Sequence, residues 1–169
     1  MKRIVRNPFL YIIFYPLLFL NNIFSQNPWI EFQIPCGSFY SIKISFPGNP
    51  KSTDNYSSGN PCYYYQTTNS TFMASVEPFS KYENLQKNLL IKEFIKGFAA
   101  SVISEKEEYI NGFRNIEAYY ALPNKVGYGS IRFVFVNERL IILVYFSMNY
   151  AKEEFSKFSN SLKIWSLRK

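Results

Sequence analysis

The feature that most constrains the fold is an unbroken apolar run from Leu140 to Phe146. A strand that faces water on one side alternates apolar and polar residues, whereas a strand covered on both faces is apolar throughout. We therefore predict that 140–146 is a central strand with packed layers on both sides. Together with 131–136, across Asn137-Glu138-Arg139, it forms a predicted hairpin.

Further strands follow from shorter patterns. Asn111-Gly112 predicts a second hairpin between 107–110 and 113–122, because both residues tolerate the positive φ of a type I′ turn. Apolar residues alternate with polar ones over 41–46, as in a half-buried strand. Segments 63–65 and 72–76 flank the polar tetrapeptide 67–70, and we predict that they form two strands joined by a turn.

Two helices are expected. Ser80 to Glu83 fits a capping box, and a helical stripe follows it, made of Leu90, Ile91, Phe94, Ile95, Phe98 and Val102. A shorter helix from about Tyr150 carries Phe155 and Phe158. The expected fold class is α+β, an antiparallel sheet flanked by helices on both faces.

The first 25 residues have the pattern of a signal peptide. Lys2, Arg3 and Arg6 precede an apolar run over 9–20, and Ser25 is small enough for cleavage before Gln26. We expect residues 1–25 to be removed and 26–169 to form one domain, secreted or periplasmic. The alternative is an uncleaved anchor, although Pro16 and two asparagines would then lie in the bilayer.

The leader also explains part of the basic charge. It holds three positive and no acidic residues, so the formal net charge of +7 falls to +4 for residues 26–169. The remaining Lys and Arg residues are dispersed along the chain. A nucleic-acid partner, which requires a clustered basic face, is therefore not expected.

The two cysteines, Cys36 and Cys62, are expected to form a disulfide, because an exported chain folds in an oxidising compartment. Closing that loop would stabilise the domain by about 3 to 4 kcal/mol on the chain-entropy estimate.

The chain has few of the residue types that commonly take part in catalysis. The chain has no histidine, which excludes histidine-assisted nucleophiles and the commonest metal ligand, and neither a metal nor a cofactor site is expected. Gly127-Tyr128-Gly129 lacks the rest of a phosphate-binding loop. Glu77 and Glu117 are the candidates for an acid and base pair acting on glycans.

Tyrosines gather near the second cysteine. Tyr56, Tyr63 and Tyr65 lie among Asn and Gln residues, and strand alternation puts Tyr63 and Tyr65 on one face, opposite Tyr64. Rings with a polar tip anchor protein partners and stack on sugars, so these three residues are the predicted binding patch.

With this order of elements, the chain from about Trp29 to Trp165 resembles the PsbP-like α/β/α sandwich superfamily. The resemblance rests on Phe46-Pro47-Gly48-Asn49-Pro50, the helix after Ser80, the Asn111-Gly112 hairpin, the hairpin over 132–145, and Phe158-Ser159-Asn160-Ser161-Leu162-Lys163. It implies a non-enzymatic accessory domain that docks onto a protein or assembly. No functional residue of the superfamily transfers to this chain.

The expected function is therefore an exported, non-catalytic binding or accessory domain whose partner is a protein or envelope assembly, with a glycan as a further option. The alternatives are a carboxylate-dependent glycan hydrolase and the same binding domain held at the membrane by its N-terminal segment.

Overall fold

The structure, a computed structural model, describes residues 28–53, 62–81, 87–149 and 151–167. The predicted leader and Tyr56 lie outside these ranges. The described strands are β1 (Ile30–Cys36), β2 (Tyr40–Phe46), β3 (Lys51–Thr53), β4 (Cys62–Gln66), β5 (Ser70–Pro78), β6 (Ser101–Ile110), β7 (Phe113–Ala121), β8 (Tyr128–Val136), β9 (Arg139–Ser147) and β10 (Lys163–Ser166). The helices are α2 (Lys87–Lys96), α3 (Lys152–Asn160) and the 3-10 turns η1 (Phe79–Lys81) and η2 (Pro123–Lys125).

Seven of the strands form one antiparallel sheet in the order β3-β4-β5-β9-β8-β7-β6. The apolar strand β9 lies in its middle, between β5 and β8, as its sequence predicts. Both predicted hairpins are present. Asn111 and Gly112 have φ of 53° and 82°, and Asn137 has φ of 49°, so the turn residues supply the positive φ that tight hairpins need.

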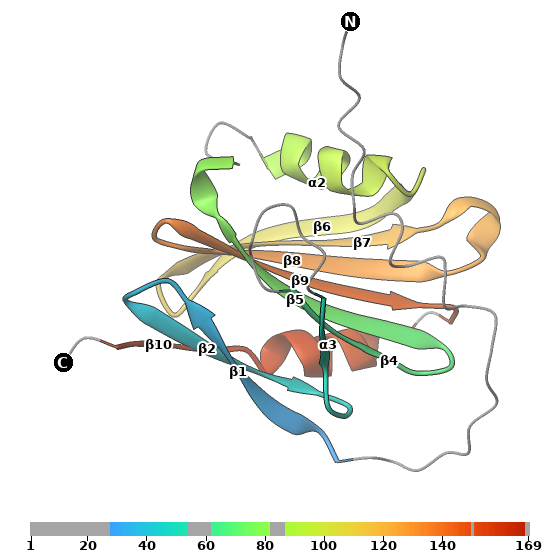
Figure 1. The fold of residues 1–169 in the computed structure, drawn as a ribbon. Coiled ribbons are helices and arrows are strands. Elements are labelled where there is room, and N and C mark those ends of the chain that lie inside the picture. The colour runs from blue at the N-terminus through green and yellow to red at the C-terminus, as the bar shows by residue number, and fades with distance from the viewer. Residues whose placement is uncertain (1–27, 54–61, 82–86, 150, 168–169) are drawn as a thin grey trace, which may run out of the picture.

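Each face of this sheet carries its own hydrophobic core (Figure 1). The α2-side core joins alternate residues of the sheet to Leu90, Ile91, Ile95 and Phe98. The α3-side core joins the other residues of the sheet to Phe155 and Phe158 of α3. Along β9 the two sets alternate from Leu140 to Phe146, which is why this run of the strand consists of large hydrophobic and aromatic residues.

A second sheet, β1-β2-β10, covers much of the α3 side. Ile34, Ile42 and Ile44 of this small sheet belong to the α3-side core. The sequence pattern predicts the strand β2, but it does not predict that a second sheet shares this face with α3. The reason is that alternation shows that a strand is half buried and does not show which sheet it joins.

The first helix is shorter than its stripe predicts. It ends at Lys96, Ala99 adopts a positive φ of 49°, and the chain turns into β6. Val102, predicted to lie on the buried helix face, is instead in an edge strand and is 40% exposed. The serine of the predicted capping box, Ser80, lies in η1, and residues 82–86 are outside the described ranges.

The predicted disulfide is not formed in the described structure. Cys36 lies in the α3-side core and Cys62 in the α2-side core, so the large sheet separates the two sulfur atoms. The expected oxidising compartment suggested a pair, but the fold places the two side chains in opposite layers. Burial raises the pKa of the Cys36 thiol to about 11, although Arg139 acts in the opposite direction.

No helix within the described residues combines the length and apolar character needed to span a membrane.

Candidate functional site

The predicted tyrosine patch is largely used for packing. Tyr63 and Tyr65 do share a face of β4, as predicted, and both pack against the α3-side core. The centre of the Tyr63 ring lies 4.7 Å from that of the Phe32 ring in β1. The Tyr65 ring packs so closely against Gly48 that a Cβ on this glycine would lie 2.5 Å from it. Both side chains are partly exposed, so their binding role remains a prediction.

The two carboxylates proposed as an acid and base pair lie on opposite faces of the large sheet. Glu77 is paired in register with Leu140 of the α2-side core. Glu117 follows Ile116 of that same core and therefore points to the α3 side. Two carboxylates separated by a sheet cannot flank one glycosidic bond.

Glu117 already has a strong partner in Arg132, its cross-strand neighbour. Arg132 Nε donates to Glu117 Oε2 over 2.7 Å, and both side chains are buried. The Arg132 guanidinium also donates to the carbonyl of Ser159 at 3.3 Å and faces the amide oxygen of Asn160, at the C-terminal end of α3. Cations are favoured at that end of a helix. The pair therefore holds α3 onto the sheet.

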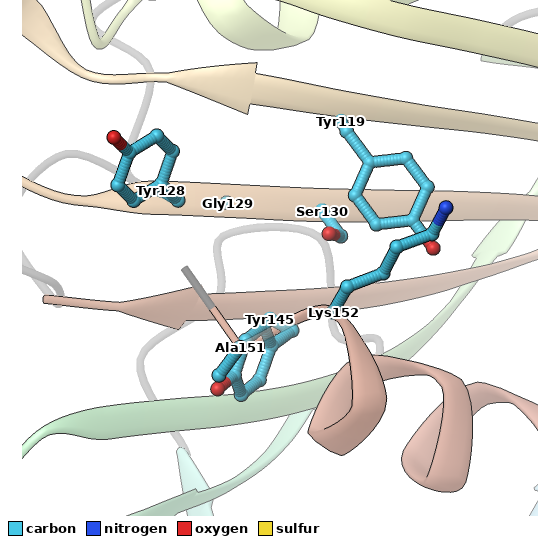
Figure 2. A pocket seen from close by; sticks show the side chains of 7 residues that line it. All are labelled: Tyr119, Tyr128, Gly129, Ser130, Tyr145, Ala151 and Lys152. Carbon is cyan, nitrogen blue, oxygen red and sulfur yellow. The ribbon is translucent and has the colours of Figure 1, made fainter. Parts of the chain in front are cut away.

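A small hollow lies at the other end of α3, on the same face of the sheet (Figure 2). It leaves about 200 Å³ of space, with the open solvent in front of it included. We call this space the α3 hollow. Its lining consists of Tyr119, Tyr128, Ser130, Tyr145, Ala151, Lys152 and the backbone of Gly129.

Hydrogen bonds fix one wall of the α3 hollow. Tyr145 donates its hydroxyl to Glu154 Oε2 over 2.6 Å, and Ser70 Oγ donates to the same carboxylate oxygen over 3.2 Å. Ser70 also bonds Ser147 at 3.2 Å. This network ties the first turn of α3 to β5 and β9, so the wall is rigid before any ligand arrives.

The hydroxyls of Tyr119 and Tyr145 stay protonated at neutral pH. Burial raises the pKa of Tyr145 to about 12, and its hydrogen bond to Glu154 acts in the same direction. Burial likewise raises the pKa of Tyr119 to about 12, with the negative charge of Glu117 adding to the effect. These two phenols therefore do not act as a general base or nucleophile near pH 7.

Two exposed apolar residues lie near Tyr128 in the strand order. Val126 is 58% exposed and precedes Tyr128 by two residues, and Met148 is 49% exposed and follows Ser147, the β9 partner of Tyr128. Aromatic side chains at a protein surface are typical anchoring points in protein interfaces.

Sequence reasoning did not find this site. Its tyrosines come from β7, β8 and β9, and its lysine from α3, so no local motif links them. The two glycines of Gly127-Tyr128-Gly129, which lacks the rest of a phosphate-binding loop, have a packing role. In the structure, a Cβ on Gly129 would lie 2.1 Å from the Tyr120 ring and one on Gly127 would lie 2.7 Å from the Phe146 ring, so both glycines serve close packing.

No group of metal-ligating side chains occurs among the described residues. The search of known families and curated proteins found no match to the chain. Among solved structures, it is similar to cyanobacterial PsbP from Synechocystis sp. PCC 6803, with a TM-score of 0.59 over 73% of this chain and 86% of that one. The chain has a PsbP-like fold. At 11% identity the similarity concerns the fold.

Proposed function

We propose that the chain is an exported, non-catalytic accessory domain that docks onto a protein or envelope assembly. Residues 1–25 are the leader in this proposal, cleaved between Ser25 and Gln26, and 26–169 are the single domain. The basic and apolar pattern of the leader supports export. The PsbP-like fold is consistent with an accessory domain.

The observation that carries the proposal is the α3 hollow with its three tyrosine rings. It offers one pre-formed, aromatic anchoring point, and burial raises the pKa of Tyr119 and of Tyr145 far above neutral pH. The carboxylates that the sequence offered for hydrolysis are separated by the sheet. Docking therefore explains more of the structure than turnover does.

The proposal is tested by purifying the tagged chain from its native host after mild cross-linking. We expect a defined protein partner in the extracytoplasmic fraction and a mature N-terminus at Gln26. An intact N-terminus in the membrane fraction would instead favour the tethered alternative. A chain retained in the cytosol with Met1 present would contradict the proposal.

Hydrolysis is tested separately on a panel of glycans. The proposal predicts no turnover by the unaltered protein. Turnover that is lost in Glu77→Gln or Glu117→Gln, with the melting temperature preserved, would contradict it.

A further inference from the structure

The α3 hollow already holds a cation. Lys152 reaches from the first turn of α3 toward Tyr119, and its Nζ lies 5.1 Å from the centre of that ring (Figure 2). An ammonium over an aromatic face is attracted by the negative charge of the ring's π-system. The side chain of Lys152 is exposed, and in the described residues it has no carboxylate within ion-pair distance.

The other groups around the α3 hollow also favour a cation. The rings of Tyr128 and Tyr145 line it beside Tyr119, and the carboxylate of Glu154 lies next to Tyr145. Glu153 is a second acidic residue in the same turn of the helix. Arg132 also acts on the Tyr119 hydroxyl, but its guanidinium is paired with Glu117.

One polar side chain in the wall has no hydrogen-bond partner among the described residues. The hydroxyl of Ser130 is only 3% exposed, lines the α3 hollow, and makes no hydrogen bond within the described part of the chain. A buried hydroxyl without a partner is costly, so the site favours an occupant that donates a hydrogen bond. A primary ammonium carries three such donors.

We propose that the α3 hollow binds the ammonium group of a lysine side chain on the partner protein, and that Lys152 occupies this place in the free protein. The inference rests on the proposed docking function and names the chemistry of its contact. Lys152 swings outward on binding and leaves its place over the Tyr119 ring to the incoming ammonium.

The test uses n-butylammonium as the probe of the purified protein, followed through the backbone amide signals of Tyr128 and Ser130 in NMR titrations. Butylammonium should shift these signals in a saturable manner, and n-butanol and acetate should not. Lys152→Met removes the internal competitor and should tighten binding by about threefold or more, the range expected for one cation–π contact. Tyr128→Leu removes one ring and should weaken it.

Lys157→Met is the matched control. Lys157 lies on the same helix and its Nζ is 4.6 Å from the ring of Trp29, so this variant removes an equivalent charge and cation–π contact away from the α3 hollow. It should leave butylammonium binding unchanged. Equal tightening in both lysine variants would show a general charge effect and overturn the proposal, as would equal shifts with acetate or no shift in Lys152→Met.

The result also separates this inference from the docking function. A partner that co-purifies equally well with the unaltered chain and with Tyr128→Leu supports docking but overturns the lysine contact. Butylammonium binding without any co-purifying protein supports the cation site while contradicting the docking function.

Discussion

Glu117 and Arg132 form an ion pair in which both side chains are buried. The arginine satisfies the carboxylate and also donates to the end of α3, so one guanidinium links two strands and a helix. Breaking such a pair leaves an isolated buried charge, whereas replacing both partners with apolar residues is much less costly.

Glu117→Leu should therefore lower the free energy of unfolding by about 3 to 5 kcal/mol, because Arg132 is left buried without its counter-ion. The double variant Glu117→Leu/Arg132→Met should recover most of that loss. Urea denaturation followed by circular dichroism measures both. A loss below about 1 kcal/mol in the single variant would show that the pair is hydrated.

Because of the buried phenols of Tyr119 and Tyr145, the free energy of unfolding depends on pH in the alkaline range. Because the pKa of Tyr119 and of Tyr145 rises from 10 in the unfolded chain to about 12 in the folded one, the folded state retains these protons longer. Their stabilising contribution is complete below pH 10 and is lost as the pH rises toward 12. Tyr145→Phe should make this decline shallower, as measured by urea midpoints between pH 9 and 12. An equally steep decline in that variant would contradict a raised pKa of Tyr145.

At the scale of elements, the strands were predictable where the pattern was local. The run over 140–146 and the Asn111-Gly112 turn each predicted their strand or hairpin. The helical stripe failed at Val102, because the same apolar spacing continues past Ala99 into β6 and spacing alone does not mark where a helix ends. The α3 hollow could not be predicted, since its residues come together only through the pairing of β7, β8 and β9.

The boundary between α2 and β6 can be tested with two substitutions. Phe98→Ala should cost about 3 to 5 kcal/mol, because its ring is buried in the α2-side core. Val102→Ser should change stability by no more than about 0.5 kcal/mol, because this residue is exposed on an edge strand. Thermal unfolding of the two variants compares them directly. Similar large losses would place Val102 in the core and restore the longer helix.

At the scale of the whole molecule, one seven-stranded sheet separates two cores. One core is closed by α2 and the other by α3 together with the small sheet. Because of this layering, neither pair that the sequence suggested comes together. Glu77 and Glu117 lie on opposite faces of the large sheet, and so do Cys36 and Cys62. Pairs of distant residues become predictable only once the face of each strand is known.

The layering predicts the behaviour of the cysteines. The folded protein should react slowly with a thiol reagent, since both side chains are buried and the pKa of Cys36 is raised. After denaturation without a reductant, two thiols per chain should react. If no thiol reacts, and if the mass of the chain increases on reduction, the two cysteines form a disulfide. That result would contradict the separation of the two side chains by the large sheet.

The central claim is that the end of the molecule around the α3 hollow is the docking surface. Photo-cross-linking in the native host tests it most directly, with p-benzoylphenylalanine placed at Lys152 in the α3 hollow or at Leu89 on α2. Both side chains are exposed, and their helices pack on opposite faces of the large sheet. We predict a discrete cross-linked protein from Lys152 and none from Leu89. A cross-link from Leu89 alone would place the docking surface on the other face, and that result, or no cross-link from either position, would contradict the account.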